Sequence, residues 1–144
     1  MTKFKQGFYK PKNPEKFISS SKSLNEHSNL KLPQYRSSYE LKFFKFCDLN
    51  PKIEKWSTEP FPIYYISPVD NKKHRYYIDI LIFINNQKYL IEIKPFSQTQ
   101  SPKNNNKYEI LRYQVNLAKW KACKEFCDRN GYKFLIITEK ELGI

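Results

Sequence analysis

The sequence predicts an α/β domain with a mixed sheet, in the element order αβββαβ, preceded by an extended amino-terminal arm. Runs rich in β-branched and aromatic residues at 76–84 and 88–94 are separated by Asn85-Asn86, and Asn tolerates the positive φ of a tight hairpin turn. A helical repeat over 108–130 then precedes an apolar run at 132–138. A helix in that place is a crossover connection, so the last strand is expected to be parallel to a sheet neighbour.

The amino-terminal arm is predicted over residues 1–34 and the folded domain over residues 35–144. The arm is basic, has Ser and Asn clusters and lacks a sustained hydrophobic period. It offers only a few side chains that can pack on the domain, namely Phe4, Phe8, Tyr9 and Phe17.

The first helix is expected to begin at Ser37, because Ser37 with Glu40 three residues later fits a capping box. One apolar face of this helix carries Leu41, Phe44 and Cys47, with Glu40 nearby, and Asn50-Pro51 ends it. The capping role explains Glu40 without any chemistry, and a role as a metal ligand is equally open.

The middle of the chain alternates strands with a polar connection. Phe61–Ile66 is a β-rich run that neighbouring prolines limit to a sheet edge or to strand ends. Residues 69–75 form a connecting loop, and 76–84 is the strongest strand pattern, since every residue except Asp79 is β-branched, aromatic or Leu. Residues 97–106 are polar and predict a flexible loop that borders the end of the strand at 88–94.

The second helix is expected over Tyr108–Asn130, with Asn130-Gly131 as its C-cap. Its Lys residues are interpreted mainly as a solvated face, with contact to a partner for some of them. Trp56 and Trp120 are interpreted as core residues.

Composition narrows the class of function. The formal net charge is +12, from 26 Lys and Arg against 14 Asp and Glu, which favours a polyanionic partner over a membrane. No run is apolar enough to span a bilayer and no signal peptide is recognisable, so the protein is expected inside a cell. Three Cys and two His suggest neither a disulfide framework nor a Cys or His metal site.

The hairpin register brings charged groups together. Glu92 and Lys94 lie on the same face of their strand, and a two-residue turn places Asp79 directly opposite Glu92, with Lys94 diagonal to Asp79. Carboxylates at that separation, about 4.5 to 5.5 Å between Cβ atoms, repel each other when ionised. Either Lys94 alone offsets this repulsion, as in a simple salt bridge, or the pair binds a hard cation such as Mg²⁺.

This arrangement resembles the PD-(D/E)xK nuclease superfamily, which has a restriction-endonuclease-like core; the match falls on Glu40, Ile78-Asp79 and Glu92-Ile93-Lys94. Ile78 departs from the Pro usual before this Asp, at a position that supplies no ligand. A closer resemblance, to the head completion nucleases of T4-like tailed phages, covers almost the whole chain. It is carried by Gly7 to Phe17, Tyr35 to Leu41, Trp56 to Glu59, Tyr65 to Pro68, His74 to Asp79 and Leu90 to Pro95. The core is also similar to the endonuclease subunit of Tn7-type transposition machinery.

The resemblance implies a DNA endonuclease that uses Mg²⁺, with Mn²⁺ as a substitute. Asp79, Glu92 and the Ile93 carbonyl would ligate the metal, and Glu40 would ligate a second metal or hold one of its waters. Lys94 would orient or deprotonate the attacking water and stabilise charge on the scissile phosphate. DNA contacts would come from Gln98, Arg112, Gln114 and the loop pair His74-Arg75.

The resemblance also implies partners and a place of action: double-stranded DNA, phage portal or neck proteins, and the virion, after assembly in the host cytoplasm. Two alternatives remain open at this stage. The first is a structural head-completion or neck protein that binds DNA or the portal region with little turnover. The second is the transposase-subunit role, which would require partner proteins.

Overall fold

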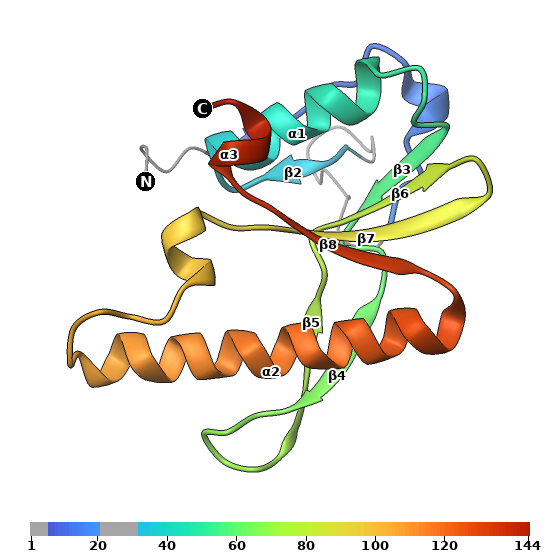
Figure 1. Cartoon of the computed structure of the whole chain (residues 1–144). Coiled ribbons are helices and arrows are strands. Elements are labelled where there is room, and N and C mark those ends of the chain that lie inside the picture. Colours follow the sequence, from blue (N-terminus) through green and yellow to red (C-terminus); the bar gives the residue numbers. More distant parts are fainter. Residues whose placement is uncertain (1–5, 21–31) are drawn as a thin grey trace.

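The computed structural model describes residues 6–20 and 32–144 of the chain. Figure 1 shows its helices in chain order, α1 (Ser38–Leu49), α2 (Lys107–Asn130) and α3 (Glu139–Leu142), with the 3-10 turns η1 (Pro14–Lys16) and η3 (Phe96–Thr99). The strands are β1 (Gly7–Phe8), β2 (Gln34–Tyr35), β3 (Lys55–Thr58), β4 (Pro62–Ile66), β5 (Lys73–Tyr77), β6 (Ile80–Ile84), β7 (Gln87–Ile93) and β8 (Lys133–Ile137). Within the described residues, no helix is long and apolar enough to cross a membrane.

The central sheet is mixed and has the strand order β3-β6-β7-β8. Strand β6 is antiparallel to both β3 and β7, whereas β8 is parallel to β7. Helix α2 connects the two parallel strands, as the crossover argument requires. The predicted α/β class and mixed sheet are confirmed.

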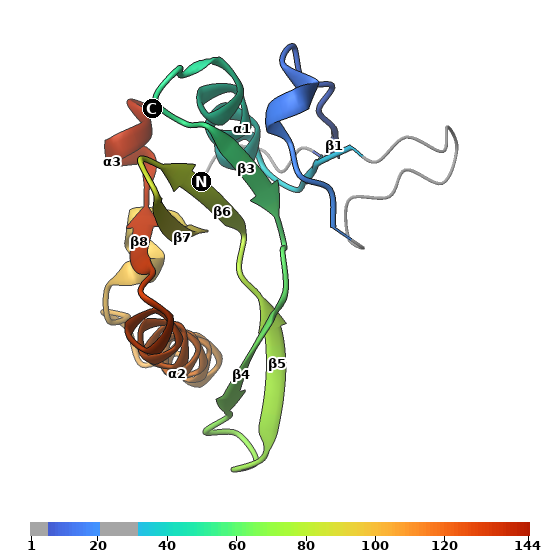
Figure 2. The same cartoon turned by 90° about the vertical axis from the view of Figure 1, so that its right-hand side faces the viewer.

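Helices α1 and α2 cover opposite faces of this sheet, as Figure 2 shows from the side. Strand alternation sorts the core into two layers. The layer beneath α1 contains Phe44, Trp56, Ile80, Ile91 and Ile93, and the layer beneath α2 contains Leu81, Leu90, Cys123 and Cys127. Even-numbered residues of β7 therefore face α2, so Glu92 lies on the α2 side.

The hairpin between β6 and β7 forms as predicted. Asn85 and Asn86 both have positive φ, 49° and 65°, which is the backbone of a two-residue type I′ turn. The ladder runs from the Ile84–Gln87 pair to the Ile80–Ile91 pair. The register from which the site was predicted is thus confirmed.

The prediction of one continuous strand over 76–84 is wrong. The run is divided at Ile78-Asp79, because β5 pairs with β4 whereas β6 pairs with β3. Strand β5 also begins at Lys73, so the predicted loop over 69–75 is shorter and His74 and Arg75 are strand residues. The division leaves Asp79 at a bend between the two sheets, outside the paired residues of both.

Several short elements were not predicted, among them β1, β2, β3, η1, η3 and α3. Strand β3 has one large apolar residue, Trp56, and is a strand because it pairs with β6. Helix α3 has four residues, too few for a helical period, and a capping box between Thr138 and Glu141 stabilises it. By contrast, the predicted C-cap of α2 is present, since Gly131 has a φ of 73°.

The described part of the amino-terminal arm is docked on the domain. Phe17 and Tyr9 pack against Trp56, with ring centroids 4.8 and 6.5 Å away. The buried carboxylate of Asp48 accepts hydrogen bonds from the Tyr9 hydroxyl and from the backbone N–H groups of Lys12 and Asn13. Phe8 is 40% exposed, and Phe4 lies outside the described residues.

Candidate active site

Two carboxylates meet at the edge of the central hairpin. The Ile80–Ile91 pair ends the ladder, so its next step brings Asp79 opposite Glu92. Asp79 Oδ2 accepts a hydrogen bond from the Ile93 N–H at 2.7 Å. This bond holds the Asp79 side chain against β7, while the Asp79 carbonyl accepts a hydrogen bond from the Glu59 N–H at 2.9 Å on the β3 side.

Glu92 is buried between β7 and α2, with 5% of its surface exposed. Trp120 Nε1 donates a hydrogen bond to Glu92 Oε2 at 3.2 Å, and Lys94 Nζ lies 3.8 Å from the same oxygen. A surface salt bridge would leave this carboxylate solvated. Glu92 is instead buried and oriented by the Trp120 indole, and only its partner Lys94 is partly exposed.

The electrostatics of the pair favour a bound cation. Burial raises the pKa of the Asp79 carboxyl well above its usual range, and the charges of Glu92 and Glu40 raise it further. The hydrogen bond from Ile93 and the charge of Lys94 act in the opposite direction. A divalent cation would relieve the repulsion and favour the ionised form of Asp79.

Glu40 approaches the site from the first turn of α1. Ser37 caps this helix by accepting a hydrogen bond from the Glu40 N–H, but the predicted capping box is not reciprocal. Glu40 Oε1 instead accepts from the Arg36 N–H at 2.8 Å. Burial raises the pKa of Glu40, whereas Arg36 and Lys94 lower it.

The donor set suits a cation that keeps part of its water shell. Within residues 6–20 and 32–144, no group of three or more His, Cys, Asp or Glu side chains converges to hold a metal. Asp79 and Glu92 are neighbouring carboxylates, and Glu40 is close enough for its charge to raise the pKa of Asp79. Mg²⁺ fits such a site, because it is bound in many proteins by one or two carboxylates plus water.

Lys94 lines a groove of about 390 Å³ that lies along α2. Among its lining residues are Lys94, Gln98, Arg112, Asn116 and Lys119. The structure therefore brings together three of the residues predicted from the sequence, Lys94, Gln98 and Arg112. The cations and amides of this lining can contact a phosphate backbone, and the rest of the lining is apolar, from Val69, Tyr108, Leu111 and Val115.

Other predicted DNA-contacting residues lie elsewhere. Gln114 is exposed on a different face of α2 and does not line the groove. His74 and Arg75 are successive residues of β5, so their side chains point to opposite faces. His74 Nε2 lies 2.8 Å from Asp70 Oδ2 in an ion pair when His74 is protonated.

Lys119 was missed as a site residue. Its ammonium lies 5.6 and 5.8 Å from the ring centroids of Tyr76 and Tyr65, within the same groove as Lys94. Burial lowers the pKa of Lys119, and the charge of Lys94 lowers it further. The available signal was helical spacing, because Arg112 and Lys119 are seven residues apart and share one face of α2.

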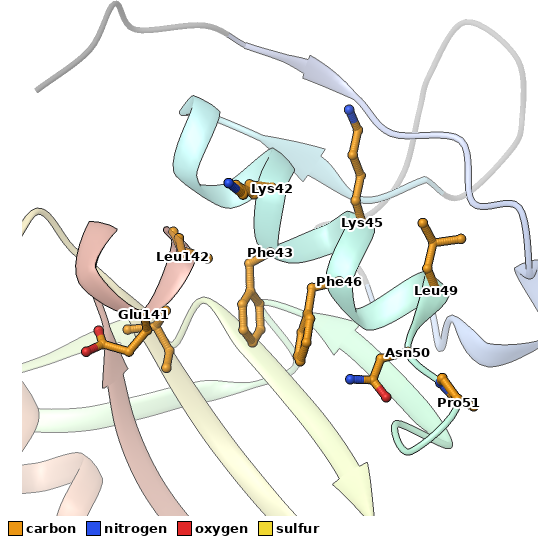
Figure 3. Close-up of a pocket in the computed structure, with 10 residues that line it drawn as sticks. Lys42, Phe43, Lys45, Phe46, Leu49, Asn50, Pro51, Glu141 and Leu142 are labelled. Atoms are coloured by element: carbon orange, nitrogen blue, oxygen red, sulfur yellow. The ribbon is translucent and has the colours of Figure 1, made fainter. Parts of the chain in front are cut away.

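A larger groove, of about 750 Å³, lies between α1 and α3 on the other face of the sheet (Figure 3). Its lining is mainly apolar and includes Phe43, Phe46, Leu49 and Leu142. The one carboxylate there, Glu141, accepts hydrogen bonds from the backbone and hydroxyl of Thr138 in the cap of α3. The other charged residues of its lining, Lys42 and Lys45, are exposed cations, so this lining holds no pair of carboxylates for a metal.

The comparisons with known proteins agree with this geometry. The model of the TnsA-like endonuclease N-terminal domain matches residues 50–139, a range that includes Asp79, Glu92 and Lys94. The chain is also 35% identical over 147 residues to the head completion nuclease of enterobacteria phage T4, covering 94% of this chain and 92% of that protein. The fold is the restriction-endonuclease-like α/β fold of this domain. The chain belongs to the TnsA-like endonuclease family.

Proposed function

We propose that this chain is a metal-dependent endodeoxyribonuclease that hydrolyses phosphodiester bonds of double-stranded DNA during phage head completion. The observation that carries the proposal is the convergence of Asp79 and Glu92 with Lys94 at the mouth of a basic groove. Similarity to the T4 head completion nuclease supports the place of action. On that basis the chain acts in the virion and, during assembly, in the host cytoplasm, beside portal or neck proteins.

Asp79 and Glu92 would hold Mg²⁺, or Mn²⁺ in its place, with the Ile93 carbonyl as a further ligand and Glu40 behind them. The ion supplies Lewis-acid activation of the phosphate and a more acidic water. Trp120 and the Ile93 N–H orient the two carboxylates before substrate arrives, so little reorganisation is needed.

Lys94 holds the attacking water and offsets the charge that develops on the phosphate. Its ammonium is partly exposed, with 28% of the side chain accessible, and it faces the groove rather than being enclosed by protein. Gln98, Arg112 and Lys119 line the same groove and bind the flanking phosphates. The scissile bond would thus lie between the carboxylate pair and the groove.

The test is plasmid nicking with Mg²⁺ by the wild type and by D79A, E92A and K94A. D79A and E92A are expected to lower the rate by roughly a hundredfold or more, since metal ligands matter at least as much as the groups that orient them. K94A is expected to lower it by about a hundredfold or more, because it removes a group that stabilises charge on the reacting phosphate. D128N is a matched control, because Asp128 is an exposed carboxylate of α2 paired with Lys124. Its rate is expected to equal that of the wild type.

A binding measurement on the same proteins separates the enzyme from a structural head-completion protein. Wild-type protein that binds duplex DNA but nicks no plasmid with Mg²⁺ or Mn²⁺ would refute the catalytic proposal. Equal nicking by wild type and D79A would refute the assignment of the site. Thermal unfolding of each variant checks that a lost activity is not a lost fold.

A further inference from the structure

Strands β4 and β5 form a two-stranded ribbon that neither joins the central sheet nor pairs with a third strand among the described residues. Figures 1 and 2 show that it extends away from the central sheet and past α2. Its register pairs Tyr64 with Arg75 and Ile66 with Lys73. A ribbon with one face on the protein leaves its other face for solvent or for a partner.

The inner face of the ribbon accounts for its attachment. Ile63 and Tyr76 are buried in the layer beneath α2. The Tyr76 hydroxyl donates a hydrogen bond to the Lys119 carbonyl at 2.9 Å. Tyr65 and His74 occupy the same face, and His74 is paired with Asp70. Packing thus explains the inner residues without a ligand.

The outer face has no such explanation. It carries Tyr64 (53% exposed), Ile66 (58% exposed) and the exposed cations Lys73 and Arg75. Lys73 Nζ lies 4.7 Å from the centroid of the Tyr64 ring, and neither cation forms an ion pair within the described residues. The only carboxylate between residues 61 and 78, Asp70, is engaged by His74. The outer face is therefore cationic and aromatic, with no charge of its own to offset the cations.

The ribbon is joined directly to the candidate active site. Strand β5 ends at Tyr77, two residues before Asp79, and Val69 in the turn between β4 and β5 lines the same groove as Lys94 and Lys119. A polyanion lying in that groove would pass the β4–β5 turn at Val69. The major groove of B-DNA is wide enough to admit a two-stranded β-ribbon.

We propose that the outer face of the β4–β5 ribbon, defined by Tyr64, Ile66, Lys73 and Arg75, binds a groove of duplex DNA and positions the duplex over Asp79 and Glu92. Lys73 and Arg75 contact phosphates, and Tyr64 and Ile66 supply apolar contact. Its role in cleavage rests on the proposed function, whereas DNA binding by the ribbon does not.

The test measures binding of the full chain to a short labelled duplex in EDTA, by fluorescence anisotropy, across about 50 to 200 mM salt. The plot of log K against log salt has a negative slope, to which each phosphate contact contributes about −0.9. K73A/R75A is therefore expected to make this slope less negative by about 1.8. At about 0.1 M salt its Kd is expected to rise about tenfold or more. Y64A is expected to weaken binding without changing the salt slope.

K42A/K45A is the matched control. Lys42 and Lys45 are exposed on α1, beside the apolar groove and on the other face of the sheet, so this variant removes the same charge elsewhere. Its salt slope is expected to remain near that of the wild type. Equal losses in the two double variants would overturn the proposal, because net charge alone would then explain them.

Cleavage separates this proposal from the proposed function. K73A/R75A is expected to nick DNA more slowly than the wild type in step with its weaker binding, whereas D79A is expected to bind DNA like the wild type and not nick it. If the wild type does not nick DNA, the anisotropy measurement still tests whether the outer face of the ribbon binds DNA. Unchanged duplex binding by K73A/R75A overturns the inference. If that variant binds DNA normally but fails to join phage heads, the face is a protein contact instead.

Discussion

Replacing Trp120 with Phe tests whether the indole orients Glu92 for metal binding. The substitution removes the hydrogen bond of 3.2 Å from Nε1 to Glu92 Oε2 but keeps an aromatic ring, in a place where both side chains are less than a tenth exposed. A hydrogen bond to a charged group contributes about 1.5 to 3 kcal/mol. W120F is therefore expected to lose at least about 1.5 kcal/mol of unfolding free energy beyond the cost of the smaller ring.

The effect on the metal is the more specific part of this prediction. Removing a group that orients a metal ligand weakens metal affinity by about 10 to 100-fold. The Mg²⁺ concentration that gives half of the maximal nicking rate is expected to rise by that factor. The maximal rate at saturating Mg²⁺ is expected to change much less, because Trp120 does not touch the reacting atoms.

Trp56 provides the matched control. It is fully buried beneath α1, and none of the described residues accepts a hydrogen bond from its Nε1. W56F therefore changes ring size without removing a hydrogen bond, and its Mg²⁺ requirement is expected to match the wild type. If W120F and W56F have the same Mg²⁺ requirement, the orienting role is refuted and Trp120 is a packing residue only.

Three further predictions concern the carboxylates and the hairpin turn. D79N keeps an acceptor for the Ile93 N–H but removes a carboxyl group whose folded pKa is raised. Such a group destabilises the folded protein at neutral pH, so without metal D79N is expected to be more stable than the wild type. Added Mg²⁺ is expected to raise the melting temperature of the wild type and not that of D79N. Burial acts to raise the pKa of Asp48, but hydrogen bonds from Tyr9, Lys12 and Asn13 outweigh it and lower the pKa. The contribution of Asp48 to stability is thus present above the unfolded pKa of about 3.9 and is lost as the pH falls through the lower folded pKa. D48N is therefore expected to lower the unfolding free energy by about 2 kcal/mol at neutral pH and to weaken its dependence on acid pH. N86A is expected to lower the unfolding free energy by about 1 kcal/mol, because Ala tolerates the φ of 65° less well than Asn.

Each of these has an outcome that contradicts it. If calorimetry in EDTA finds D79N less stable than the wild type, repulsion between Asp79 and its neighbouring carboxylates does not destabilise the protein. An acid titration in which D48N and wild type lose stability in parallel would show that Asp48 is not the group that titrates. Chemical denaturation that finds N86A as stable as the wild type would argue against a strained turn at that residue.

Local geometry was predictable from the sequence because it depends on neighbouring residues. Asn85 and Asn86 specify the turn, the turn specifies the register, and alternation places Glu92 and Lys94 on one face. Gly131 ends α2 for the same local reason. The turn and the alternation together are sufficient to bring Asp79 opposite Glu92.

Tertiary structure decided which neighbours each segment has. The run over 76–84 has strand propensity throughout, and only the change of partner from β4 to β3 divides it at Asp79. Glu40 fits a capping box in sequence, yet its carboxylate bonds to Arg36 and lies near Asp79. Trp120 and Lys119 reach the site from a helix that begins more than ten residues after β7.

The sequence by itself thus determined the pairing of the two carboxylates, because a hairpin register follows from a turn and a period of two. Only the tertiary structure decided that Glu92 is buried against Trp120, that Lys119 shares the groove of Lys94, and that β4 and β5 leave the sheet as a separate ribbon. Those features depend on how α2 packs across the sheet. Contacts between segments distant in the chain have no local pattern to predict them.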